Sequence, residues 1–172
     1  VVSGKGKFNA RLMSVTFPRL WMQSGSENLP RVARLCVDPS RAPITFQSHS
    51  EQPPTVFSGK EVSPADIIFF SRGESFVNRT AGLNDWSAMS LDPEALTDAS
   101  RAITGRDLTA PRSTRVMRPV AALVTRLTDL HRRVMHMAVS VPDRLAHPEV
   151  ARAVEHELVH LMVRCLTDNS ES

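Results

Sequence analysis

The sequence predicts an α+β fold in which an N-terminal β-barrel or β-sandwich precedes a helical part. Three observations lead to this prediction. Short apolar runs separated by turn residues fill residues 1–91. Apolar residues then recur every three or four positions within residues 92–172. The stretch 61–76, EVSPADIIFFSRGESF, has the pattern of a strand, a tight turn and a further strand, which is typical of an all-β core.

The central run of residues 67–70, IIFF, contains four apolar residues without alternation. Such a run between turn signals predicts a strand with protein on both of its faces. Upstream, Ser58-Gly59 is expected to turn a hairpin that pairs 56–57 with 61–62. Counting all such runs gives about eight or nine short strands, a number that favours a β-sandwich or a jelly-roll barrel.

Helical signals begin at Asp92, which is a suitable N-cap, and Pro93, which suits the first helical position. A short helix over 93–103 is expected to end at Gly105. Two longer amphipathic helices are predicted at about 119–139 and 148–167, joined as an antiparallel hairpin. The segment 107–118 is expected to be a connector, and the residues after Thr167 to be disordered.

Composition limits the function classes. The chain has 172 residues, a formal net charge of +3 and no basic run, so nothing in it predicts a nucleic-acid surface. No segment approaches the roughly 20 apolar residues of a membrane span, and no signal peptide is expected at the start. Cys36 and Cys165 are far apart in apolar segments, which favours free buried thiols and a cytoplasmic location over a disulfide.

The central stretch resembles the second half of a cupin barrel. Pro64, Asp66 and Gly73 stand at the matching positions of the cupin motif, but Phe76 stands where that motif normally carries a histidine. The order of FPRLWMQSG, VARLCV, PITF, the central stretch, WSAMSLDPEAL and ITGRDLTAPR resembles AraC-type transcription regulators. That resemblance covers most of the chain.

The resemblance implies a cupin-like β-barrel of the jelly-roll type over 1–91 and a helical part over 92–172 packed on it. It implies an effector-sensing and dimerising domain that is not an enzyme. AraC-type regulators bind DNA through two helix-turn-helix units, and this chain contains no such pair. We therefore expect DNA contact only through a C-terminal domain absent from this chain.

A barrel of this size can hold one small molecule. We expect its effector, which the sequence does not identify, among the large aromatic side chains, with an arginine facing any anionic group. The candidate ligand-binding residues are Trp21, Arg34, Phe46, Phe70, Phe76 and Trp86, with Arg79 as an alternative arginine. Core packing alone is the competing interpretation of each aromatic residue, and alternation does not establish which strand faces point inward.

The resemblance also implies that the long helices form a homodimer contact. The candidate residues of this contact on the first long helix are Leu123, Leu127, Leu130 and Val134. On the facing helix, Leu158 and Met162 would lie opposite. The alternative is that both apolar stripes are buried within one chain.

The sequence predicts no catalytic residue, metal or cofactor. His156 and His160 form an HExxH pattern, which can bind zinc, but the helix periodicity places both away from the apolar stripe. The β-part contains a single histidine, His49, too few for a cupin metal site. A small-molecule-binding cupin enzyme is the alternative hypothesis, and a zinc peptidase a more remote one.

Overall fold

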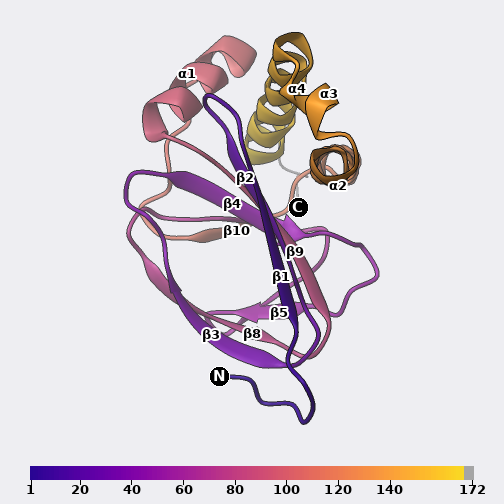
Figure 1. Cartoon of the computed structure of the whole chain (residues 1–172). Coiled ribbons are helices and arrows are strands. Elements are labelled where there is room, and N and C mark those ends of the chain that lie inside the picture. The colour runs from indigo at the N-terminus through magenta and orange to yellow at the C-terminus, as the bar shows by residue number, and fades with distance from the viewer. Residues whose placement is uncertain (169–172) are drawn as a thin grey trace.

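A computed structural model describes residues 1–168. It has an α+β fold in which two antiparallel sheets lie below a layer of helices (Figure 1). This confirms the predicted fold class. The strands are β1 (Ala10–Thr16), β2 (Trp21–Glu27), β3 (Arg31–Cys36), β4 (Ala42–Gln47), β5 (Thr55–Phe57), β6 (Lys60–Val62), β7 (Ile67–Phe69), β8 (Ser75–Thr80), β9 (Asn84–Leu91) and β10 (Arg115–Met117). The helices are α1 (Pro93–Thr104), α2 (Ala121–Ser140), α3 (Pro142–Ala146) and α4 (Pro148–Thr167).

The strands form a six-stranded sheet in the order β1-β2-β9-β4-β7-β10 and a four-stranded sheet in the order β3-β8-β5-β6. The β-part is therefore a sandwich of two facing sheets. One difference from the sequence prediction is β10, which lies in the expected connector and pairs with the edge of β7 through Val116 and Ile68. The boundary predicted after residue 91 thus does not separate the sheet from the helical part.

The hairpin of β5 and β6 forms as predicted, with Val56 opposite Glu61. Ser58 and Gly59 both have positive φ angles, 45° and 83°. Two consecutive positive φ angles are the requirement of the type I′ turn, whose twist matches that of the flanking strands. A glycine at the second position meets this requirement at little steric cost.

The IIFF run lies in β7 and at its end, and protein covers both of its faces. Ile67 and Phe69 belong to the core between the sheet and the helices. Ile68 and Phe70 belong to a second apolar cluster between the two sheets. This double burial explains why the run shows no alternation.

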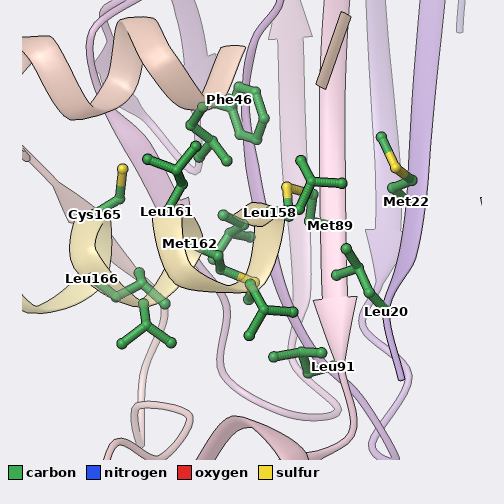
Figure 2. Close-up of a cluster of buried hydrophobic side chains, with 14 of the residues drawn as sticks. Leu20, Met22, Phe46, Met89, Leu91, Leu158, Leu161, Met162, Cys165 and Leu166 are labelled. Carbon is green, nitrogen blue, oxygen red and sulfur yellow. The ribbon is translucent and has the colours of Figure 1, made fainter. Parts of the chain in front are cut away.

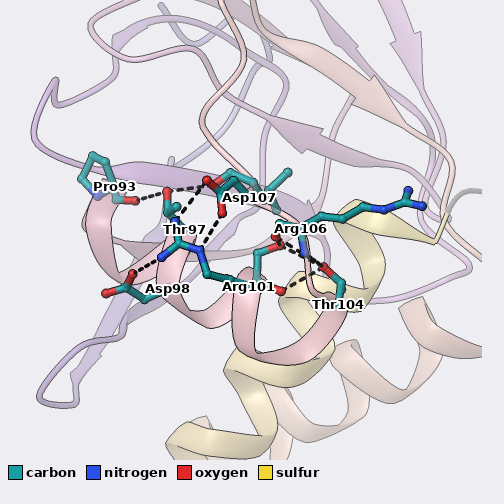
Figure 3. Close-up of polar contacts among 9 residues, drawn as sticks. Pro93, Thr97, Asp98, Arg101, Thr104, Arg106 and Asp107 are labelled. Atoms are coloured by element: carbon teal, nitrogen blue, oxygen red, sulfur yellow. Dashed lines mark hydrogen bonds and ion pairs between the residues drawn. The ribbon is translucent and has the colours of Figure 1, made fainter.

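Helix α1 begins and ends at the predicted signals. The Asp92 carboxylate accepts a hydrogen bond from the backbone N–H of Ala95 at 2.9 Å, and Gly105 ends the helix with a φ of 73°. The following loop folds back on the helix through an ion pair of Arg101 with Asp107 at 2.9 Å (Figure 3). The connection to β10 is therefore tied to α1.

The main core lies between the helices and the outer face of the six-stranded sheet. Leu158 and Met162 of α4 are fully buried in it, in the same cluster as Met22 of β2 and Met89 of β9 (Figure 2). Alternate residues of each strand point to this side, since successive side chains of a strand face opposite ways. The helices thus cover one face of the sheet and leave its other face to the sandwich interior.

Glu155 of α4 ties the helical layer to the β1–β2 turn. Its carboxylate is buried and accepts hydrogen bonds from the backbone N–H groups of Arg19 at 2.7 Å and Leu20 at 3.0 Å. These two donors have no partner in the sheet ladder. The Glu155 carboxylate therefore provides the hydrogen-bond acceptor for two backbone N–H groups about 135 residues away in sequence.

Two further predictions can be compared with the structure, and a third falls mainly outside it. The helices over 119–139 and 148–167 are found as α2 and α4, with the unpredicted short helix α3 between them. Both cysteines are free, but Cys36 is exposed and only Cys165 is buried, which corrects the expectation of two buried thiols. The disorder expected after Thr167 falls mainly on residues 169–172, which lie outside the described residues.

Candidate functional site

A cavity of about 650 Å³ lies between the two sheets. Both sheets contribute lining residues, and the six-stranded sheet provides its floor through alternate residues of β2, β4 and β9. Trp21 and Gln23 of β2 line it, as do Trp86, Ala88 and Ser90 of β9. The volume lies within the range typical of small-molecule sites.

The Trp86 indole packs against Gly25 on the neighbouring strand. The two residues are directly opposite in the β2–β9 register. A Cβ atom added at Gly25 would lie 2.3 Å from Cε2 and Cζ2 of the Trp86 indole. The missing side chain therefore makes room for the ring and sets its position in the cavity.

An aromatic cluster of Phe57 from β5, Phe76 from β8 and Phe70, which follows β7, forms an apolar wall of the cavity. The Phe76 ring centroid lies 4.7 Å from that of Phe57 and 4.9 Å from that of Phe70. Such distances are typical of favourable aromatic pairs. The position where the cupin motif has a histidine is therefore an apolar wall in this protein.

One end of the cavity is closed and polar. Glu27 and Asn84 are cross-strand partners there, and both are buried. The Glu27 carboxylate pairs with the Arg31 guanidinium at 2.8 Å. Gln47, also buried, donates from Nε2 to the carbonyl oxygen of Pro53 at 3.0 Å.

The opposite end is open to solvent. Arg41 lies there and donates to the hydroxyl oxygen of Ser90 at 3.0 Å and to the Ser90 carbonyl oxygen at 2.6 Å. Asp38 and Cys36, which also line this end, are exposed. The cavity therefore extends from Arg41 at this end to Asn84 at the other.

The structure places four of the predicted aromatic residues on the cavity, namely Trp21, Phe70, Phe76 and Trp86. Phe46 borders it, but its ring belongs to the helix-side core and packs edge-on against His131 at 5.5 Å. These positions are consistent with ligand binding and with packing alone, so ligand binding by these residues stays a prediction.

The predicted arginines lie elsewhere. Arg34 and Arg79 are exposed and are not among the cavity-lining residues. The reason is strand parity: Arg31 of β3 faces inward, so Arg34 faces outward. The arginines that line the cavity are Arg31 and Arg41.

Sequence reasoning missed the polar residues of the closed end. Asn84 and Trp86 are two positions apart on one strand, so an inward Trp86 requires an inward Asn84. By the same argument, Gln47 and Thr45 of β4 must face the same side of the sheet. The missing information was the identity of the inward face, which depends on where the helices pack.

His131 of α2 connects the helical layer to the cavity floor. Its Nε2 lies 3.4 Å from the carbonyl oxygen of Ala88, a cavity-lining residue of β9. Burial lowers the pKa of His131 from 6.5 to about 4, so the ring is neutral at pH 7. A second hollow of about 200 Å³ lies beside this histidine, on the opposite side of β9 from the cavity.

The HExxH pattern lies on α4. His156 is exposed, His160 is half-buried, and Glu157 forms an ion pair with Arg126 at 3.0 Å. Within residues 1–168, no group of three or more potential metal-ligating side chains comes together. The cavity lining contains no histidine in this part of the chain.

The predicted dimer residues fall into two groups. Leu127 and Val134 are buried within the chain, with 0% and 1% exposure, so they are not available to a partner in this arrangement. Leu158 and Met162 of the facing helix are fully buried as well. Leu123 and Leu130 are only partly buried and remain accessible.

The fold resembles that of a transcription regulator. A crystal structure described as the AraC-like transcriptional activator CuxR matches with a TM-score of 0.60 at 16% sequence identity. The match covers 96% of this chain and 58% of that chain, so this chain spans less than two thirds of the regulator's length. The predicted resemblance to AraC-type regulators is confirmed at the level of the fold.

Two further solved structures match over shorter lengths. The Clostridium difficile EutQ protein matches with a TM-score of 0.38 and 11% identity, covering 48% of this chain and 68% of that chain. A mutant of salicylate 1,2-dioxygenase from Pseudoaminobacter salicylatoxidans has a TM-score of 0.35 and 16% identity, covering 61% of this chain and 34% of that chain. No family model matches the sequence, and no curated protein does.

No helix within residues 1–168 combines the length and the apolar character that a membrane span requires.

Proposed function

We propose that this chain is the effector-sensing and dimerising domain of a cytoplasmic AraC-type transcription regulator. The observation that carries the proposal is the cavity of about 650 Å³ between the sheets, with its two tryptophans and its polar closed end. The fold likeness to an AraC-like activator supports the same function. In this proposal, contact with DNA is made by a separate helix-turn-helix domain.

Sensing in this proposal works by a shift of populations. A ligand that binds one arrangement of β9 and α2 more tightly than another favours that arrangement. His131 contacts the backbone of Ala88 from the helix side, while Ala88 lines the cavity on the other side. This contact provides a physical route from the cavity to the helical layer.

Binding can be tested with a fluorescence screen, because both tryptophans of the chain line the cavity. We expect members of a metabolite library to change the tryptophan emission saturably. Ala88→Phe, which fills the cavity floor, should abolish the change. Val32→Phe, on the solvent-exposed face of β3, should leave it intact. Equal responses of the two variants would contradict sensing in the cavity.

Dimerisation in this proposal uses the accessible stripe of α2. Leu123, Leu130 and Met137 repeat every seven residues and are each partly buried, as at one position of a coiled-coil heptad. We expect sedimentation velocity at micromolar concentration to show a dimer that Leu130→Asp converts to a monomer.

The matched control for dimerisation is Val139→Asp. Val139 is 68% exposed and lies nine residues from Leu130, about 180° around the helix. This variant should remain dimeric. A monomeric wild-type protein, or dimer loss in the control alone, would overturn the dimerisation part of the proposal.

A further inference from the structure

We propose that the closed end of the cavity binds an uncharged group of the effector that carries N–H or O–H donors, and that Asn84 and Gln47 are its hydrogen-bonding partners. This inference rests on the proposed function, because it takes the cavity to be a ligand site. It adds the chemical class of the group that reaches the closed end and the orientation of the ligand.

Two buried carboxamides at the closed end have unused hydrogen-bonding capacity. Gln47 is 5% exposed, and its Oε1 is buried without a hydrogen-bond partner among residues 1–168. Asn84 is 4% exposed, and its side chain makes no hydrogen bond within that range, although it lines the cavity. Buried polar groups in proteins are nearly always satisfied, so each exception requires an explanation. A ligand that donates a hydrogen bond to Gln47 and forms hydrogen bonds with Asn84 would supply this explanation.

The charges at this end exclude an ionic partner from the same position. Glu27 and Arg31 are 2.8 Å apart and cancel each other. The other arginine of the cavity, Arg41, lies at the opposite end of β9 beside Ser90, about 20 Å from Asn84 along the strand. An anionic group at the closed end would therefore be desolvated without a free cation, which is unfavourable.

The aromatic side chains next to the closed end can contact the apolar part of such a ligand. The Trp86 indole lies over Gly25. It is directly opposite Gln47 in the β4–β9 register and two residues from Asn84 on β9. Its Nε1 makes no hydrogen bond to the described part of the chain, so it is a further donor for the ligand. Toward the open end, Phe57, Phe70 and Phe76 provide an apolar wall. The ligand class is therefore a neutral molecule with a polar end and an apolar or aromatic body.

The first test is the melting temperature of the ligand-free protein. Asn84→Leu removes a cavity-lining carboxamide that makes no hydrogen bond within residues 1–168, so we expect a melting temperature equal to or above that of the wild type. The matched control is Gln52→Leu. Gln52 donates to the Asp85 carbonyl oxygen at 2.7 Å and accepts from the Asp85 N–H at 2.6 Å, so its loss should lower the melting temperature by about 3 °C or more. A similar decrease in Asn84→Leu would overturn the inference, because it would show a structural role.

The second test uses pairs of probes of similar shape that differ in charge and in N–H donors. Benzamide and naphthamide are compared with benzoate and naphthoate by titration of tryptophan fluorescence. We expect the amides to bind at least about tenfold more tightly than the carboxylates, and Asn84→Leu to weaken amide binding about tenfold, the loss expected for one or two hydrogen bonds.

The outcomes separate this inference from the proposed function. Tighter carboxylate binding that Arg41→Gln removes would overturn the inference and leave the cavity as a ligand site. Amide binding that Asn84→Leu does not change would also overturn it. Absence of binding by all four probes would count against the inference, and absence of any response in the metabolite screen would count against the proposed function itself.

Discussion

Single residues set the shape of the cavity floor. Gly25 has no side chain, and the Trp86 indole occupies the space that a Cβ atom would need. Trp21 and Trp86 are the two tryptophans of the chain, and both line the cavity. Their fluorescence therefore reports directly on the site.

Gly25→Val should displace the Trp86 ring. The added Cβ would lie 2.3 Å from two ring carbons, so the ring must move, at a cost of about 1–3 kcal/mol. Emission spectra and urea unfolding measure the two effects. Gly82→Ala is the control, because nothing lies within 4 Å of the position of its added Cβ. An unchanged emission spectrum in Gly25→Val would show that the indole is not held as described.

His131 should make stability depend on pH. Burial lowers its pKa to about 4 in the folded state, against 6.5 in the unfolded state. The unfolded state therefore binds more protons between these values, so the free energy of unfolding decreases as the pH falls from about 6.5 to 4. The full effect is about 3 kcal/mol.

His131→Phe tests this contribution. Urea unfolding at several pH values should show a flatter dependence in the variant than in the wild type across the same window. Parallel curves would contradict the assignment, because other groups would then account for the acid sensitivity.

At the scale of elements, β9 has the central position. One of its faces lines the cavity through Trp86 and Ala88, and the other belongs to the helix-side core through Met89 and Leu91. Helix α2 contacts it through His131. Helix α4 is attached to the β1–β2 turn by Glu155. A change in β9 therefore reaches the helical layer directly.

Glu155→Leu should destabilise the attachment of α4. It leaves the buried N–H group of Leu20 and the partly buried N–H group of Arg19 without their acceptor. The cost is about 1–3 kcal/mol for a buried unsatisfied group and less for a partly buried one. Urea unfolding measures the loss. Glu157→Leu removes a surface ion pair with Arg126 and should cost less than about 1 kcal/mol. Equal losses would contradict the tethering role of Glu155.

Elements with strong local signals could be predicted from the sequence. Asp92, Pro93 and Gly105 defined α1, and Ser58-Gly59 defined the β5–β6 hairpin, because caps and turns depend on local chemistry. Strand β10 could not be predicted from local signals. It has only three residues, and it forms because they pair with β7, which is distant in sequence. The inward faces of the strands were equally unpredictable, because alternation defines two faces without stating which one the helices cover.

The aromatic part of the candidate site followed from the sequence, whereas its polar part did not. Trp21 and Trp86 are large enough to be noticed without knowledge of orientation. The sequence prediction names Arg34, with Arg79 as the alternative, because alternation leaves the inward face of each strand open. The structure places Arg31 of β3 on the cavity instead. The same ambiguity concealed Asn84, a small residue whose importance depends on burial without a partner.

At the scale of the whole molecule, the helical layer covers one side of the six-stranded sheet, and the four-stranded sheet faces its other side (Figure 1). The cavity lies between the two sheets. The six-stranded sheet therefore contributes residues both to the cavity lining and to the core beneath the helices. In the proposed regulator, a ligand in the cavity changes the helical layer that forms the dimer contact. Ligand binding and dimerisation would then be thermodynamically coupled.

The most direct test of this account is hydrogen–deuterium exchange of the protein with and without the metabolite that changes its tryptophan emission most strongly. We expect slower exchange in β9 on ligand binding, together with a change in α2 on the far side of the sheet. Slower exchange confined to the outer surface, with β9 and α2 unchanged, would contradict it.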